Sequence, residues 1–247
     1  MLSMSRKWVS NVSVDCVIFG FDQDQLKVLM VERTLRKPES EEVIFSDLTL
    51  TGYHIYEDEN LDDAAARIVK DLTGLDNIRL EQFYTFGSLD RLEHPNDQLW
   101  LEQFGEVFSK RVITVGYFSL LPSTNIEIVQ KGRIVRWYPV NDVHNLAYDH
   151  QQILERALLH LRYKLQQEAI GFELLPDKFS LTDMQKLYEA VLGTCFDKRN
   201  FRKKVSQMNY VIPLKEKQKG VAHKPARLYM FSREVFKKTR KEPSFLI

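Results

Sequence analysis

Residues 180–208 read SLTDMQKLYEAVLGTCFDKRNFRKKVSQM, and this stretch decides how the C-terminal third folds. Ser180 and the aspartate three residues later have the spacing of a capping box, which predicts that a helix begins here. The apolar residues that follow recur at helical spacing, and Gly193 suits the end of that helix. A second helix is expected from Asp197, a favourable N-cap residue, to about Met208. The stretch therefore predicts two helices joined by a short turn.

A basic hairpin is predicted after these two helices. Tyr210–Pro213 and Ala226–Phe231 read as paired strands. Between them, the charged stretch Lys215–Lys224 contains a glycine, as a hairpin tip often does. The order helix, turn, helix and basic hairpin is that of a winged helix-turn-helix, so this fold is predicted for the C-terminal region.

The second predicted helix combines an apolar stripe with a cationic face. Phe201, Val205 and Met208 are spaced to anchor the helix to a core, which leaves most of its basic side chains outside. A recognition helix needs this arrangement, because arginine can bind guanine and asparagine can bind adenine in the major groove. The predicted contacts with duplex DNA are Lys198, Arg199, Asn200, Arg202, Lys203 and Lys204 on the helix, and Lys224 and Arg227 on the hairpin. A merely solvated basic helix is the alternative.

Charge divides the chain into two parts. The 247 residues include 35 Lys/Arg and 34 Asp/Glu, a formal charge of +1. Residues 174–247 contain 17 basic and 7 acidic residues, a balance of +10, which leaves residues 1–173 at −9. An acidic body followed by a basic region indicates two domains and an anionic partner for the second, with nucleic acid foremost. An interaction module that does not bind DNA is a further alternative.

Composition excludes several classes of protein. A hydrophobic content of 44% and a charged content of 28% are ordinary for globular domains, which argues against disorder and low complexity. The sequence has no run of 18 apolar residues and no apolar N-terminal signal, so we expect neither a membrane partner nor secretion. Cys16 and Cys195 are too far apart in sequence for a disulfide framework or a zinc motif, and a cytoplasmic location fits them.

The first 173 residues are predicted to mix strands with helices, so the chain is expected to be of the α+β class. Strands are predicted over 12–19, 26–31, 43–50, 82–86, 112–121 and 133–139, and the charged segment 33–42 is predicted as a loop. Helices are predicted over 61–72, with Gly74 as the cap, and over 151–167. Residues 89–110 give no clear pattern. We expect three parts: a first domain at 1–150, a linker helix at 151–173 and the winged helix at 174–247.

Residues 50–75 resemble a Nudix box, whose pattern is G-x5-E-x7-R-E-U-x-E-E-x-G-U, where U is an apolar residue. In this register Glu59 and Arg67 match the first glutamate and the arginine, and Gly74-Leu75 match the end of the box. Tyr53 stands where the pattern has its first glycine. The resemblance implies a Nudix-like sheet with helices in the first domain.

The carboxylates of this box are largely replaced. Ile68 and Leu72 stand at two of the three glutamate positions of the R-E-U-x-E-E core, and Asp71 stands at the third. Nudix hydrolysis needs a divalent metal held by several carboxylates on one helix face. We therefore expect a retained fold with no catalytic residues, no metal site and no cofactor. The alternative is an active Nudix hydrolase of ADP-ribose-like nucleoside diphosphates with an accessory DNA-binding domain.

The resemblance extends along nearly the whole chain, to the Nudix-related transcriptional regulators. The segments that carry it are 12–21, 26–31, 80–87, 111–118, 146–150, 188–193, 197–204 and 224–229. It implies a homodimer that represses or activates transcription. The Nudix-like domain would bind a small effector, and the winged helix would bind a palindromic operator. Members of this family respond to ADP-ribose or to sugars such as arabinose.

The resemblance also implies where an effector binds. The candidate residues lie near the former diphosphate cleft and are Tyr53, His54, Glu59, Arg67 and Asp71. Because the metal and diphosphate positions are altered, a plain sugar such as L-arabinose is favoured over ADP-ribose. Ordinary surface exposure or structural pairing is the alternative for each candidate, and Arg67 with Asp71 can form a simple i,i+4 ion pair.

Overall fold

The computed structural model describes residues 6–22, 24–103, 111–122, 134–220 and 224–239. The chain divides into two compact units, with the main boundary after Ala157, inside helix α3 (His150–Gln167). The first unit holds most of residues 1–157, and the second holds 158–247 with two short segments, 20–26 and 121–124. Within the described ranges, no helix is both long and apolar enough to cross a membrane.

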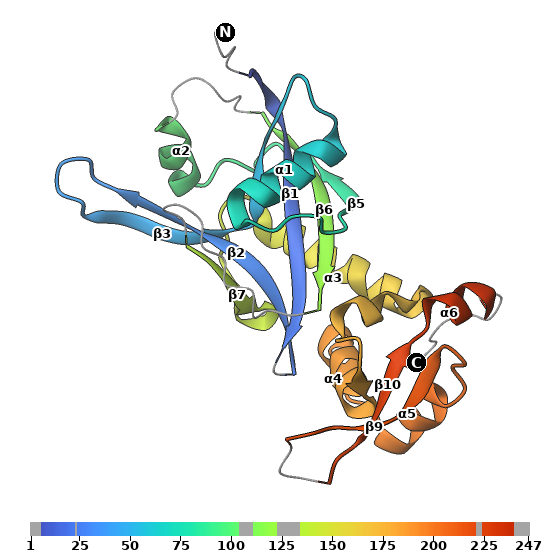
Figure 1. The fold of residues 1–247 in the computed structure, drawn as a ribbon. Helices are drawn as coiled ribbons and strands as arrows, with labels where there is room; N and C mark the ends of the chain where they lie inside the picture. The colour runs from blue at the N-terminus through green and yellow to red at the C-terminus, as the bar shows by residue number, and fades with distance from the viewer. Residues whose placement is uncertain (1–5, 23, 104–110, 123–133, 221–223, 240–247) are drawn as a thin grey trace. The chain divides into compact units, whose positions relative to one another are not determined.

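A seven-stranded sheet forms the centre of the first unit (Figure 1). Its strands are β1 (Trp8–Asp22), β2 (Gln25–Arg36), β3 (Val43–Thr49), β4 (Thr51–Tyr56), β5 (Glu81–Phe86), β6 (Ile113–Leu121) and β7 (Val135–Pro139). The strand order is β3-β2-β1-β6-β5, while β4 pairs with β1 and β7 pairs with β2. Each of the six predicted strand segments contains a strand.

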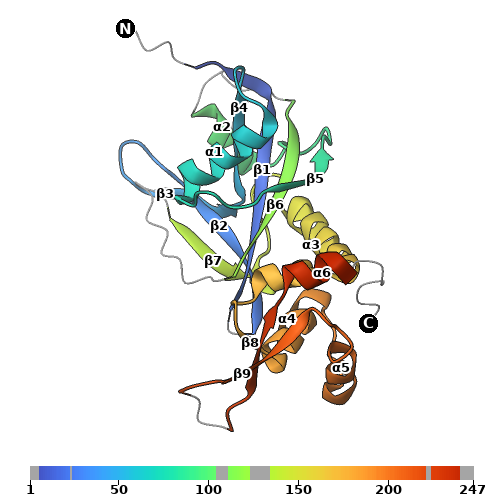
Figure 2. The ribbon, with the colours of Figure 1, turned by 45° about the vertical axis from the view of Figure 1, so that its right-hand side comes forward.

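Helices cover this sheet on both sides. Helix α1 (Leu61–Thr73) packs on β4, and the first half of α3 lies on the opposite face of the sheet (Figures 1 and 2). Because both faces are covered, the middle of β1, residues 14–19, is buried throughout. Asn60 caps the start of α1 by accepting the N–H of Asp63, and Gly74 ends the helix with φ of 76°, as the sequence predicted.

Two local predictions in the first unit were wrong or incomplete. Arg33–Arg36 continues β2 and is not part of a loop, because the charge of Arg33 is neutralised inside the fold. The segment without a clear pattern contains helix α2 (Pro95–Glu102), which His94 caps. A short 3-10 helix, η2 (Val140–Asp142), precedes α3. Residues 104–110, the rest of the unassigned segment, lie outside the described residues.

The second unit has the predicted winged helix-turn-helix (Figure 2). Its elements are η3 (Ala169–Leu174), β8 (Phe179–Ser180), α4 (Leu181–Leu192), α5 (Lys198–Val205), β9 (Val211–Lys217), β10 (Arg227–Phe231) and α6 (Arg233–Thr239). The three strands form a sheet of order β8-β10-β9. The α+β class is therefore confirmed for the chain.

The helix ends in the second unit follow the sequence closely. Ser180 and Asp183 form the capping box, and Gly193 ends α4 with φ of 69°. Asp197 caps α5 by accepting the N–H of Asn200. Helix α5 ends at Val205, earlier than predicted, because the following residues form a turn that leads into β9. Strand β8 and helix α6 were not predicted.

Candidate DNA interface and ligand cavity

Helix α5 has one buried edge and one cationic face. Phe201 and Val205 are each only 3% exposed, and the ring of Phe201 packs against Tyr188 of α4. The predicted DNA contacts on the helix are all exposed: Lys198, Arg199, Asn200, Arg202, Lys203 and Lys204. Helix α5 itself carries no acidic side chain. The structure thus places five cations and one amide on the outer surface of an anchored helix, in the arrangement that a recognition helix requires.

The turn before α5 is held by side chains of α4. Gln185 is buried, and its Nε2 donates to the carbonyl oxygen of Phe196 at 2.9 Å and to Oε1 of Glu189 at 2.9 Å. The same Glu189 oxygen accepts the N–H of Phe196 at 2.8 Å. These bonds fix the start of α5 relative to α4, and the sequence patterns did not reveal them.

The hairpin contributes the two remaining predicted contacts. Lys224 and Arg227 are exposed, and Nε of Arg227 donates to the carbonyl oxygen of Leu214 across the hairpin at 2.8 Å. This bond orients the Arg227 guanidinium while leaving its two terminal nitrogens for other partners. Residues 221–223, at the tip, lie outside the described residues.

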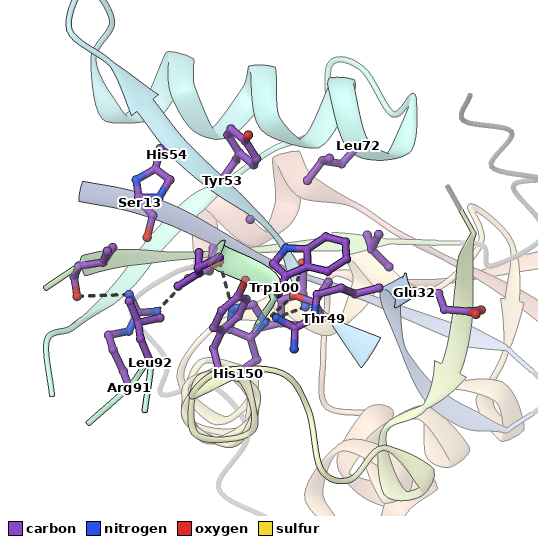
Figure 3. Close-up of a pocket in the computed structure, with 18 of the residues that line it drawn as sticks. Ser13, Glu32, Thr49, Tyr53, His54, Leu72, Arg91, Leu92, Trp100 and His150 are labelled. Atoms are coloured by element: carbon purple, nitrogen blue, oxygen red, sulfur yellow. Dashed lines mark hydrogen bonds and ion pairs between the residues drawn. The ribbon is translucent and has the colours of Figure 1, made fainter. Parts of the chain in front are cut away.

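The first unit contains a cavity of about 610 Å³, a size typical of small-molecule sites (Figure 3). Tyr53, Trp100 and Tyr148 supply aromatic surface, and Arg33, Arg36 and Arg91 supply cations. Further polar groups come from Ser13, Asp15, Thr49, His54 and His150. The wall therefore offers ring surfaces together with both hydrogen-bond donors and acceptors.

Two of the five predicted effector residues line this cavity. They are Tyr53 and His54, which neighbour each other on β4 (Figure 3). Burial lowers the pKa of His54 below its usual value, so this ring is neutral near pH 7. Glu59, Arg67 and Asp71, the other three candidates, do not line this cavity.

Glu59 and Arg67 form an ion pair with each other. Arg67 donates to both carboxylate oxygens of Glu59, at 2.9 and 2.6 Å, and also to the carbonyl oxygen of His54 at 3.1 Å. The N–H of Tyr56 donates to Glu59 at 2.8 Å. Burial by itself would raise the pKa of Glu59, but these hydrogen bonds outweigh it and leave the pKa lowered. This pair ties the loop before α1 to the helix, which explains its geometry without any ligand.

The replaced box positions are apolar in the structure as well as in the sequence. Ile68 is fully buried, and Leu72 is 8% exposed and lines the cavity. Asp71 is 61% exposed and lies 3.7 Å from Arg67 as an i,i+4 pair. Helix α1 therefore turns an aliphatic side chain toward the cavity at a position where the Nudix pattern has a carboxylate.

One wall of the cavity is a buried charge network that ends on α3. Arg91 donates to both oxygens of Asp149, at 3.0 and 2.9 Å, and lies 3.5 Å from Asp15. Asp15 also lies 3.4 Å from Nε2 of His150. Burial by itself would raise the pKa of Asp15, but His150 and Arg91 outweigh it, so that pKa is lowered and Asp15 stays ionised. The N–H of Leu50 donates to Nδ1 of His150 at 3.0 Å, so a neutral ring carries its proton on Nε2, facing Asp15.

A second buried network forms around Arg33. This guanidinium donates to Asp47 at 2.8 and 2.6 Å and to Asp97 of α2 at 2.6 Å. The other oxygen of Asp97 accepts the N–H of Tyr148 at 3.0 Å. The ring of Tyr148 lies 4.7 Å from the Arg33 guanidinium. The network thus joins β2, β3 and α2 to the segment just before α3.

Sequence reasoning missed most of these cavity residues. Asp15 interrupts an apolar strand pattern, and a charge in such a place is a usable signal of a buried polar contact. Arg33 lies two residues after Val31, the end of the apolar run of β2, and carried a weaker signal of the same kind. Arg91, Trp100 and Tyr148 lie in segments without periodicity, where no local pattern indicates the cavity.

Comparisons with known proteins match both units. Residues 9–158 match the NUDIX domain family, and residues 171–231 match the NrtR DNA-binding winged helix domain. The ADPR responsive transcriptional repressor NtrR of Acinetobacter baylyi is 28% identical over 227 residues, which cover 90% of this chain and 82% of that protein. The resemblance to Nudix-related regulators is confirmed.

Solved structures agree with this assignment. Shewanella oneidensis NrtR complexed with a 27mer DNA has 25% sequence identity and a TM-score of 0.64, with 95% of this chain and 97% of that chain covered. A MutT/nudix family protein from Enterococcus faecalis shares the fold at 21% identity and a TM-score of 0.61, with coverage of 90% and 88%. The expected sugar-responsive branch is not supported, because the Acinetobacter relative is described as responsive to ADPR.

Proposed function

The chain belongs to the Nudix family and carries a winged helix domain of the NrtR type, and from this premise we propose that it is a transcriptional repressor. It binds operator DNA as a homodimer in the cytoplasm and responds to a small effector held in the cavity of the first unit. It is a regulator and not an enzyme.

A single observation carries the DNA-binding part of this proposal. Helix α5 presents five cations and Asn200 on an exposed face, while Phe201 and Val205 anchor its other side. Phosphates attract the cations regardless of sequence, whereas arginine and asparagine can read base edges. The likeness to a NrtR structure that holds DNA supports the same role for this unit.

The first candidate effector is ADP-ribose. The Acinetobacter relative is described as ADPR responsive, and a cavity of about 610 Å³ is far larger than a single pentose needs. The exposed ring surfaces suit a nucleotide base. Ile68 and Leu72 do not argue against this ligand, because a sensor must bind its effector without hydrolysing it. The altered metal positions therefore give no reason to prefer a sugar, because binding does not require the catalytic carboxylates.

A free pentose such as L-arabinose is the second candidate, and one observation favours it. Both buried arginines of the cavity are neutralised by carboxylates: Arg33 by Asp47 and Asp97, and Arg91 by Asp149. The ionised Asp15 also lies in the wall and would repel a diphosphate. Neutral hydroxyl groups bind such a surface without this repulsion.

The test is a titration of DNA with and without effector. A duplex is first selected by the full-length chain from a randomised pool, and its affinity is measured by fluorescence anisotropy. ADP-ribose and L-arabinose are then added separately at saturation. We expect one of them to weaken operator binding by about 5- to 150-fold, the range of ordinary allosteric coupling. Selection of no specific duplex would overturn the DNA-binding proposal, and unchanged affinity with both ligands would overturn the proposed effectors.

A further inference from the structure

The cavity contains a buried donor, Nη1 of Arg33, that forms no hydrogen bond with the residues that the structure describes. Arg33 is 3% exposed and lines the cavity, yet its Nη1 has no hydrogen-bond partner among the described residues. The Nε of Arg33 donates to Asp47, and its Nη2 donates to both Asp47 and Asp97. An unsatisfied buried donor destabilises a fold, so its retention needs an explanation.

The surroundings of Arg33 define what this donor can bind. Phe45, Trp100 and Tyr148 place their rings 4.7 to 5.4 Å from the guanidinium. Two carboxylates neighbour one guanidinium, so the local charge is negative and opposes a phosphate group. A neutral acceptor can enter among the rings and accept from Nη1 without that repulsion. Sugar hydroxyls and base nitrogens share this chemistry.

Both buried networks converge on one short segment, Tyr148–His150. Asp97 accepts the N–H of Tyr148, Arg91 holds Asp149, and the Leu50 N–H bonds His150. Tyr148 has a φ of 55°, a left-handed conformation that is strained for a tyrosine and must be held by its surroundings. Helix α3 begins at His150 and continues without a break past Ala157 into the second unit.

We propose that a neutral hydrogen-bond acceptor of the effector binds Nη1 of Arg33, and that the segment Tyr148–His150 transmits this occupancy to α3. The inference rests on the proposed function and names its ligand chemistry and its transmitting element. A ligand that moves the Arg33 guanidinium alters Asp97, which in turn holds the backbone of Tyr148. The strained backbone of Tyr148 depends on these contacts, so a change in them can alter its conformation.

The contact is tested with Arg33→Lys in the full-length chain. Lysine retains the charge beside Asp47 and Asp97 but has no Nη1. Calorimetry with ADP-ribose and with L-arabinose should show that the ligand that binds wild-type protein binds the variant about tenfold or more weakly. Arg67→Lys is the matched control, because Arg67 also forms a bidentate carboxylate pair but lies outside the cavity, and its affinity should stay within about threefold.

The outcomes separate the contact from the proposed effectors. Unchanged affinity of Arg33→Lys for the bound ligand overturns the contact and leaves the proposed function standing. If neither ligand binds wild-type protein, the proposed effectors and this inference fail together, while DNA binding is unaffected. Pyrophosphate is the anionic probe, and binding of pyrophosphate that depends on Arg33 would overturn the neutral-acceptor assignment.

Transmission is tested separately with Asp149→Asn, because Asp149 holds Arg91 but does not line the cavity. With the ligand at a concentration that saturates this variant, the ratio of operator affinities without and with ligand should fall by about fivefold or more. Asp142→Asn, the same substitution at an exposed position, should leave the ratio unchanged. An unchanged ratio in Asp149→Asn overturns the proposed transmission.

Hydrogen exchange on the wild-type protein tests the proposed transmission without any variant that could misfold. Hydrogen exchange at the amides of Tyr148 and Leu50 reports the bonds to Asp97 and His150. Ligand binding should change the exchange rates of both amides by about fivefold or more. Identical exchange at saturating ligand would show that the segment does not sense the cavity.

Discussion

At the scale of single residues, two aliphatic side chains underlie the proposal that the protein binds its effector without hydrolysing it. Ile68 is fully buried and Leu72 lines the cavity, at positions where the Nudix pattern has metal-binding carboxylates. We predict that the protein with Mg²⁺ releases no AMP from ADP-ribose at a rate resembling enzymatic turnover. Chromatography of the reaction measures this, with an active Nudix hydrolase run in parallel. Metal-dependent turnover of about 1 per second or more, typical of enzymes, would contradict the prediction.

The Glu59–Arg67 pair makes a second prediction at this scale. Glu59 is 6% exposed and accepts two bonds from Arg67, so Glu59→Gln should lower the free energy of unfolding by about 1–3 kcal/mol at pH 7. The pKa of Glu59 is lowered in the folded state, so its stabilisation is present above the unfolded pKa and is lost as pH falls through the folded pKa.

The measurement is denaturant unfolding of wild type and Glu59→Gln from pH 7 down to pH 3. The difference in unfolding free energy should shrink below the ordinary glutamate pKa of 4.5. Asp71→Asn is the control. Asp71 is 61% exposed and its pair with Arg67 is long, at 3.7 Å, so this substitution should change the free energy of unfolding little. A difference that does not depend on pH would mean that the carboxylate charge is irrelevant.

At the scale of elements, some side chains of α5 are predicted to contact DNA bases and others to contact phosphates. Changing Arg199, Asn200 or Arg202 to alanine should weaken binding to the selected duplex by about 1–3 kcal/mol for each side chain that contacts a base edge. Changing Lys203 should weaken binding to all duplexes and reduce the salt dependence by about one phosphate contact.

Anisotropy titrations at several salt concentrations, on the selected and on a scrambled duplex, separate these two effects. Lys178→Ala is a suitable control, because Lys178 is a cation of the same unit that is not part of α5 and is paired with Glu216. Equal loss on both duplexes for Arg199, Asn200 and Arg202 would show that α5 does not read sequence.

The sequence predicted best those elements whose ends are determined by residues close together in the chain. Ser180, Gly193 and Asp197 each cap a helix through neighbouring residues, so their roles were predictable from spacing. The strand character of residues 33–36 was not, because the partners of Arg33 lie 14 and 64 residues further along the chain. A charged residue satisfied by distant carboxylates resembles a loop residue until the fold is known.

The same distinction explains the candidate site. Tyr53 and His54 line the cavity from β4, the strand that contains the start of the box, so the motif itself indicated them. Glu59 and Arg67 match the box but form an ion pair with each other. A residue at a retained motif position can therefore keep a structural role without contacting a ligand. Arg33 and His150 reach the cavity from opposite ends of the first unit's sequence, and only tertiary contacts bring them together.

At the scale of the whole molecule, the prediction concerns how many chains occupy an operator. One α5 reads only a few base pairs, so useful specificity requires two recognition helices on half-sites about 34–36 Å apart per helical turn. We predict two chains per selected duplex, measured by sedimentation or mass photometry. Inserting about 5 base pairs between the half-sites turns one half-site to the opposite side of the duplex, and affinity should fall about tenfold or more. A 10-base-pair insertion restores the facing and should recover part of that loss if the connection through α3 tolerates the added distance. Affinity that ignores both insertions would show that the chains bind one at a time, and effector control through a dimer would then have no geometric basis.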